Sequence, residues 1–309
     1  MKRNFKSEMM LLTVTFIWGS SFVAQKFGLQ NIGPLTFFGI RSLIGALFLS
    51  CLVLFQANTQ QKSMEVYKRK DLLKGGILCG IALFTAGALQ QVGVAYTTVG
   101  KTGFITSLYV VIVPLLGLFM GRRLKPLMIL CIAGTVVGLY MLCMPAGEFS
   151  IRNFGTGEVL VLLSTFFFSV HIILIDKFTG RADSIKLSWL QFITVTVVAL
   201  PAMFLIDPVI PVPGEGYCYG LPNLKDILSS IIPLLYSGVL SSGVAYTLQI
   251  KAQSHINPVV ASVILCFEAV FAALCGAVVL HEMMSAREIT GCIIMFISIA
   301  AAKCMKVEK

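Results

Sequence analysis

Residues 258–280 read PVVASVILCFEAVFAALCGAVVL, an apolar run in which Glu268 is the single charged residue. A run of ~20 apolar residues is long enough to cross the hydrocarbon core of a bilayer as a helix. The run is continuous rather than alternating, which argues against a membrane strand. Nine further apolar runs accompany it, at 9–25, 34–55, 72–96, 102–120, 126–144, 158–178, 187–206, 227–248 and 289–303. The sequence therefore predicts an all-α membrane protein with ten transmembrane helices.

The composition of the whole chain agrees with this class. Of the 309 residues 57% are apolar and 12% are charged, and the mean hydropathy is +0.89. A soluble domain has about a quarter charged residues, so soluble and disordered classes are excluded. The net charge of +10 is spread in short basic runs between the apolar segments. Such runs are typical of contacts with lipid headgroups, and we expect no nucleic-acid partner.

The basic residues also predict an orientation. Ten helices place both termini on one side of the membrane. If that side is cytoplasmic, eighteen of the 24 basic residues flank it, five lie on the other side, and Arg41 lies inside a helix. Because cytoplasmic loops are enriched in Lys and Arg, we expect a multi-pass protein of the cytoplasmic membrane with both termini cytoplasmic.

Matching residues recur at a nearly constant offset along the chain. The pairs, 151 to 157 residues apart, are Lys26 with Lys177, Asp71 with Asp226 and Gly134 with Gly291. We expect a first repeat at 1–145, a linker at 146–157 and a second repeat at 158–309. Five helices in each half is an odd number, so the second half must insert upside down. Two inverted five-helix repeats around a midplane site are typical of transporters.

Two ionisable residues lie deep in the expected helices. Glu268 lies roughly 15 Å along the ninth helix, near the bilayer centre, where a charge costs about 2.5–3.5 kcal/mol. It is a candidate for binding a substrate cation or a proton, and the alternative is a structural carboxyl group. Arg41 lies about 10 Å into the second helix. It could hold a substrate carboxylate, pair with Glu268, or extend its side chain to the interface.

Other polar and aromatic side chains could line a central cavity together with these two. Each alone could equally be a hydrogen-bonding contact between helices. The candidates are Tyr109, Gln91, Tyr246, Trp18, Thr106, Gln249 and Trp189, with Ser242 at helical spacing from Tyr246. Three prolines inside helices free backbone carbonyls and are hinge candidates: Pro114, Pro201 and Pro233.

Enzyme and metal motifs are incomplete. The stretch AYTTVGKT at 95–102 has Ala95 where a phosphate-binding loop begins with glycine. His281 and Glu282 begin a zinc motif, but Ser285 stands where the second histidine is needed. The nine cysteines form no CxxC pair and read as packing residues. We therefore expect no catalytic residue, no metal site and no cofactor.

Four stretches together resemble a known family. They are FIWGSSFVAQK (16–26), FFGIRSLIGALFL (37–49), GKTGFITSLYVVIVPLLGLFMGRRL (100–124) and NPVVASVILCFEAVFAALCGAVVLHE (257–282). They resemble EamA-domain proteins of the drug/metabolite transporter superfamily, over essentially the whole chain. The resemblance implies ten helices, cytoplasmic termini and a central cavity. In that family a Glu-Pro pair is common in the ninth helix; Glu268 matches it and Ala269 departs from it.

These observations predict a secondary transporter that exports small metabolites such as amino acids, amines or drug-like compounds by alternating access. The third, fourth, eighth and ninth helices should line the pathway, helped by the first, second, sixth and seventh, while the fifth and tenth brace the halves. The alternatives are a sugar-phosphate or nucleotide-sugar antiporter and a non-transporting scaffold or receptor. The expected partners are a small solute and membrane lipid; a proton or counter-solute and the oligomeric state stay open.

Overall fold

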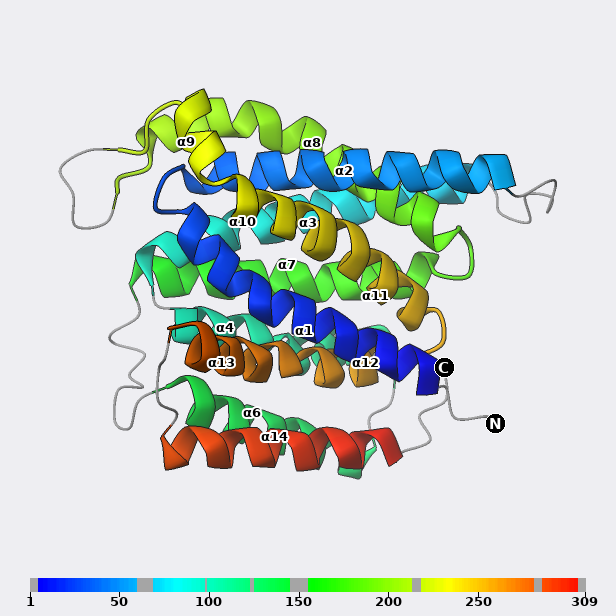
Figure 1. The fold of residues 1–309 in the computed structure, drawn as a ribbon. Helices are drawn as coiled ribbons and strands as arrows, with labels where there is room; N and C mark the ends of the chain where they lie inside the picture. The colour runs from blue at the N-terminus through cyan, green and yellow to red at the C-terminus, as the bar shows by residue number, and fades with distance from the viewer. Residues whose placement is uncertain are drawn as a thin grey trace.

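The computed structural model describes residues 5–59, 69–97, 99–122, 125–144, 155–212, 218–280 and 285–304. Within these residues every element of regular secondary structure is a helix. The only β contacts there are two isolated bridges. Figure 1 shows the long helices lying side by side as one bundle. Most of the expected linker at 146–157 lies outside the described residues, as do His281 and Glu282.

The first half of the chain supplies the first five spans. They are α1 (Phe5–Gly28), α2 (Pro34–Thr59), α3 (Arg69–Tyr96), the pair α4 (Val99–Ser107) and α5 (Tyr109–Phe119), and α6 (Pro126–Cys143). The fourth span is therefore one apolar run interrupted at Leu108.

The second half supplies the other five spans. The sixth span is α7 (Thr156–Phe178), and the seventh is α8 (Ser184–Ile206), which a 3₁₀ turn η2 (Asp207–Val209) extends. The eighth span consists, in series, of α9 (Leu224–Ser229), α10 (Ile231–Leu235), the π-helix η3 (Tyr236–Ala245) and α11 (Tyr246–Gln253). The ninth consists of α12 (Pro258–Leu265) and α13 (Phe267–Leu280), and the tenth is α14 (Ala286–Cys304). Nine stretches of the described chain are long and apolar enough to cross a membrane, and α14 is a tenth helix. The predicted ten-helix fold is confirmed.

Local chemistry explains several helix boundaries. Pro126 and Pro258 begin α6 and α12, where the missing N–H of proline has no cost. The Asp183 carboxylate caps α8 by accepting the N–H groups of residues 185 and 186, both at 3.0 Å. The turn before it contains Gly180 at a φ of 77°, a left-handed conformation that glycine adopts without steric strain. These features fix the tight hairpin between α7 and α8.

The two halves of the chain interleave rather than form separate bundles. The most extensive helix contacts are α3 with α7, α6 with α14, α2 with α8, α3 with α8 and α1 with α13, each joining one half to the other. In Figure 1, α2 and α8 lie along one edge of the bundle and α6 and α14 along the opposite edge. Helices from both halves therefore surround the middle of the molecule.

Glycines set the closest of these contacts. A Cβ atom added to Gly138 on α6 would lie 2.7 Å from the carbonyl oxygen of Gly291 on α14, and the reverse substitution would give 2.6 Å. Lipid tails are as apolar as leucine, so membrane helices associate through such close backbone packing. Gly76 and Gly80 play the same part where α3 meets α8.

Candidate functional site

A central cavity of about 550 Å³, including space open to solvent at its mouth, lies among the helices. The lining side chains are Trp18, Ser21, Phe22, Gln25, Arg41, Gln90, Thr106, Tyr109, Phe168, His171, Ile172, Ser241, Tyr246, Gln249, Leu265 and Glu268. They come from α1 to α5, α7 and the eighth and ninth spans. None of α6, α8 and α14 contributes a residue. The helices α6 and α14 were expected to brace the halves, whereas α8, the seventh span, was expected to help line the pathway.

Glu268 forms the acidic side of the cavity. It lies in the first turn of α13, just after the ninth span is interrupted at Cys266, and is 4% exposed. Ala269 stands where the family commonly has a proline, and the span is interrupted here without one. The Tyr109 hydroxyl donates to the Glu268 carboxylate at 3.2 Å.

The two interrupted spans meet at their interruptions. Tyr109 is the first residue of α5, directly after the interruption at Leu108. The Cys266 thiol donates to the Ser107 carbonyl oxygen at 3.3 Å, so the two interruptions lie side by side. Gly19 of α1 packs on the same place, because a Cβ atom there would lie 2.6 Å from the Glu268 carbonyl oxygen. Discontinuous helices crossing at mid-membrane commonly form transporter binding sites.

Arg41 forms the basic side of the cavity. It is 8% exposed, so the side chain is buried rather than extended to the interface. The guanidinium lies 5.0 Å from the ring centre of Phe38 and 5.9 Å from that of Phe37, within the range of cation–π contacts. Its Nε has no hydrogen-bond partner among the described residues. Pairing with Glu268 was one of three alternatives for Arg41, and the described residues contain no ion pair between the two within 4.0 Å.

Aromatic side chains also line the cavity and cluster around Tyr246. Tyr246 lies 4.8 Å from Trp18, 5.3 Å from Phe192 and 5.8 Å from His171, measured between ring centroids. Tyr246 lines the cavity together with Arg41 and Glu268. The cavity therefore has two charged sides and an aromatic wall.

Seven of the nine predicted cavity residues line this one cavity: Glu268, Tyr109, Tyr246, Trp18, Arg41, Thr106 and Gln249. The structure places the other two elsewhere. Gln91 is fully buried away from the cavity, and its neighbour Gln90 lines it instead, donating to the Thr106 hydroxyl at 2.9 Å. Trp189 donates its indole N–H to the Ser50 hydroxyl at 2.8 Å, in a contact between α8 and α2.

In the eighth span, Ser241 rather than Ser242 is among the residues that line the cavity. Ser242 was expected beside Tyr246 because the two are four residues apart, as on an α-helix. The backbone from 236 to 245 is instead a π-helix, and Ser241, five residues before Tyr246, lines the cavity. The Ser241 carbonyl accepts the Trp18 indole N–H at 3.4 Å. Apolar periodicity carries no signal for such a π segment, which is often found at functional sites.

The three hinge candidates lie inside helices, Pro114 in α5, Pro201 in α8 and Pro233 in α10. The interruptions beside the cavity are elsewhere, at Leu108 and Cys266. A hinge role for the prolines stays a prediction. In the part of the chain that is described, no group of three His, Cys, Asp or Glu side chains could hold a metal ion.

Comparison with known proteins gives consistent matches over the whole chain. The model of the EamA-like transporter family matches residues 5–144 and 155–302. A protein named "Uncharacterized transporter" from Archaeoglobus fulgidus is 26% identical over 96% of this chain and 85% of its own length. "Uncharacterized transporter YoaV" of Bacillus subtilis is 24% identical, covering 92% of each chain. A solved structure described only as the crystal structure of a protein shares the fold, with a TM-score of 0.76 and 15% identity over 97% of this chain and 98% of that one.

Proposed function

Since the chain belongs to the EamA-like transporter family, we propose that it is a secondary transporter that exports a small metabolite by alternating access. The solute is an amino acid, an amine or a related compound that binds in the central cavity. Several helices from each half surround that cavity, so a movement between them would expose it to one side and then the other. A family of transporters supports transport rather than catalysis, and we propose no chemical step.

The observation that carries the proposal is the pair of unmatched charges, Arg41 and Glu268. Both are more than nine-tenths buried in the same cavity, and they form no ion pair with each other. An unpaired charge at membrane depth is costly and is usually retained for function. A solute with a carboxylate and an ammonium group would neutralise both residues at once. An amine would neutralise Glu268 alone.

The remaining lining favours a solute with an apolar body. Rings from Trp18, Tyr109, Phe168 and Tyr246 line the cavity. Aromatic walls with a few polar groups are usual in small-molecule sites, because the polar groups orient the ligand and the rings bury it. A sugar phosphate or nucleotide sugar is less well supported, since Glu268 would repel its phosphate and Arg41 is the one guanidinium lining the described cavity.

The setting of this activity is part of the proposal. We place the protein in the cytoplasmic membrane, with both termini in the cytoplasm and lipid around the bundle. Residues 1–145 and 158–309 form the two repeats, joined by 146–157. Glu268 is the residue through which a proton or counter-solute would be coupled to the solute.

The test uses purified protein in liposomes and three probes that share the isobutyl group of leucine: leucine, 3-methylbutylamine and 4-methylpentanoate. We expect flux of leucine above that of the carboxylate. Arg41→Met should lower leucine flux roughly 10- to 100-fold, the loss of one charge-assisted hydrogen bond, and should spare the amine. Lys251→Met, on the exposed end of α11, is the matched control and should change neither flux.

The same assay distinguishes the alternatives. A broad metabolite panel should be run with and without a proton gradient. Flux of phosphorylated sugars alone would favour the antiporter alternative. If no solute moves in any condition, the protein is a scaffold or receptor and the proposal is wrong.

A further inference from the structure

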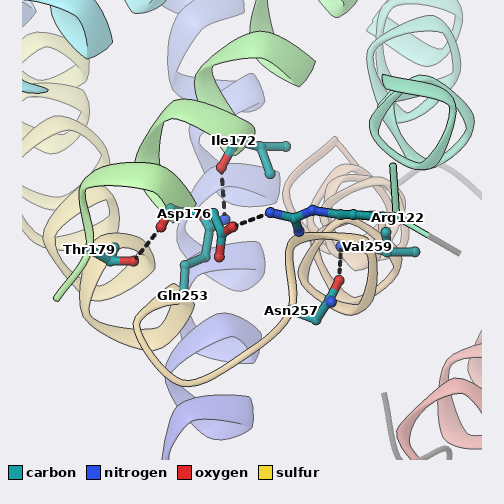
Figure 2. A network of polar contacts seen from close by, with 7 residues as sticks. All are labelled: Arg122, Ile172, Asp176, Thr179, Gln253, Asn257 and Val259. Carbon is teal, nitrogen blue, oxygen red and sulfur yellow. Dashed lines mark hydrogen bonds and ion pairs between the residues drawn. The ribbon is translucent and has the colours of Figure 1, made fainter. Parts of the chain in front are cut away.

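An ion pair joins the two halves of the chain at the end of the bundle where α1 begins. Arg122, just after α5, and Asp176, near the end of α7, approach to 2.7 Å between Nη2 and Oδ2. The Asp176 side chain is 10% exposed and that of Arg122 is 34% exposed. Figure 2 shows the guanidinium reaching across to the carboxylate from a neighbouring helix.

A second contact lies beside this ion pair and connects it to the cavity. The Gln253 side chain, fully buried at the end of α11, donates from Nε2 to the Ile172 carbonyl oxygen at 3.2 Å. Ile172 itself lines the cavity. Figure 2 shows Gln253, Asp176 and Arg122 converging in one layer. This layer therefore lies between the cavity and the end of the bundle where α1 begins.

At the opposite end α7 and the eighth span separate. There the eighth span packs on α1 and α2: the Ser230 hydroxyl contacts the Gly28 carbonyl oxygen at 3.5 Å, and Gly238 packs against Ile44. The beginning of α7 packs instead on α3 and α4, where Glu158 pairs with Lys101 at 3.7 Å. Among described residues the substantial contacts between α7 and the eighth span run through α11 alone. The two helices are joined at one end and apart at the other.

The inverted repeat relates the contact between α7 and α11 to a contact at the other end of the bundle. The sixth and eighth spans correspond to the first and third, so the matching contact would join α1 to α3. These two helices make no substantial contact in the described structure. The offset of 151 residues that relates Lys26 to Lys177 also relates Gln25 to Asp176. Gln25 lines the cavity, and its Oε1 has no hydrogen-bond partner among the described residues. The contact made at one end is thus missing at the other.

We propose that the Arg122–Asp176 ion pair and the Gln253–Ile172 hydrogen bond form a gate that closes the cavity at the end where α1 begins. Gln25 belongs to the matching gate at the opposite end, which is open in this conformation. The proposal rests on the proposed alternating-access transport. Partly exposed ion pairs and single hydrogen bonds each change an equilibrium by roughly fivefold, which suits a contact that must break in every cycle.

The test measures access to the cavity separately from transport. Ser241→Cys places a reporter in the cavity without removing the Ser241 carbonyl that Trp18 uses. Cys51 and Cys218, the exposed cysteines among those whose exposure is described, are replaced by serine. Membrane vesicles of both orientations, with sidedness set by a tag at the N-terminus, are treated with a membrane-impermeant maleimide. Parallel vesicles without the Ser241→Cys change give the background labelling.

We expect the reporter to label mainly from the side opposite the N-terminus. Asp176→Asn should raise labelling from the N-terminal side about fivefold, and Gln253→Leu should also raise it. Exchanging the two charges, with Arg122→Asp and Asp176→Arg in one protein, should restore the original ratio of labelling from the two sides. Lys101→Gln is the matched control. It breaks the ion pair with Glu158, which lies on α7 about five turns from Asp176, and it should not raise labelling from the N-terminal side.

Unchanged N-terminal labelling in both Asp176→Asn and Gln253→Leu would overturn the gate while leaving transport by the unmodified protein intact. An equal rise in N-terminal labelling in Lys101→Gln would also overturn the gate, because a general loosening of α7 would then explain the labelling of both variants. Labelling that changes as expected in a protein that moves no solute would instead contradict the proposed function and retain the gate.

Discussion

Two residues that lie 159 positions apart in the chain form the centre of the site. Tyr109 and Glu268 each follow an interruption in a membrane-spanning helix, and the hydrogen bond between them holds the carboxylate toward the cavity. The sequence identified both residues because each is polar within a long apolar run. It could not show that they touch, since no local pattern relates the fourth span to the ninth.

The charge on Glu268 should be required for transport. Glu268→Gln keeps the shape of the side chain but removes its charge, so we expect flux to be abolished or uncoupled from the driving gradient while expression is retained. Tyr109→Phe removes the hydroxyl that orients the carboxylate and should lower flux about tenfold, the typical effect of one hydrogen bond to a charged group. Both are measured by solute flux in liposomes.

Tyr140→Phe on α6, a helix that contributes nothing to the cavity, is the matched control for the tyrosine change. It should retain full flux. Undiminished flux in Glu268→Gln would assign that residue to structure alone.

The neighbouring residues Gln90 and Gln91 show which part of the cavity lining could be predicted from the sequence. Gln90 and Gln91 are equally polar and both lie deep in α3, and either could have faced the cavity. Successive helix positions are rotated by about 100°, so a one-residue error moves a side chain to another face. The sequence predicted that this turn of α3 is polar, and the packing of α3 against its neighbours selected Gln90.

The packing of the helices depends on how closely their backbones can approach one another. At the seam between α6 and α14, backbone meets backbone through Gly138 and Gly291. Gly134 and Gly138 are four residues apart in the sequence, and small residues at this spacing permit close contact between membrane helices. Their partner helix emerged only from the structure.

We expect Gly138→Ala to destabilise the protein, because the new methyl group would lie 2.7 Å from the Gly291 carbonyl oxygen and the helices would have to separate. Overpacking of this kind costs roughly 1–3 kcal/mol, partly offset by the better helix propensity of alanine, about 1 kcal/mol. The measurement is the thermal unfolding midpoint in detergent.

Gly103→Ala is the same chemical change at a position where an added Cβ meets nothing within 4 Å. It should leave the midpoint unchanged or raise it slightly. Equal midpoints for the two variants would show that the α6–α14 seam tolerates the separation.

The eighth span shows an element whose type the sequence did not specify. Its hydropathy predicted a membrane-spanning helix, which is correct. Ten of its residues nevertheless form a π-helix, and this changes which serine faces the cavity. Both helix types satisfy every backbone hydrogen bond within the segment, so the bilayer does not distinguish them. The neighbours of the segment do, including Gly45 and Phe48 of α2, which pack closely on it.

At the scale of the whole molecule, the interleaving of the repeats has a mechanical consequence. Each half contributes one member to each of the five most extensive helix pairs. The two sequence halves therefore do not move as two separate blocks. Under the proposed alternating access, the movement that opens the cavity occurs between groups that contain helices of both halves.

The orientation of the whole bundle can be tested directly. We expect a reporter fused to either terminus to be accessible only from the cytoplasm, because eighteen of the 24 basic residues flank that side. A fluorescent protein, which matures in the cytoplasm, and an alkaline phosphatase, active only outside it, give opposite signals. Phosphatase activity at either terminus would contradict the predicted topology.

The sequence by itself determined the number of spans, their order, the inverted duplication and the small set of polar residues available for a site. It could do so because the bilayer acts on each segment separately and rejects polar groups wherever they occur. The tertiary structure decided which helices pair, which polar residues share one cavity, that Arg41 and Glu268 stay apart within it, and that Arg122 meets Asp176. Those outcomes depend on the packing of one apolar helix against another, and a lipid-facing surface and a helix-facing surface are almost equally apolar in sequence.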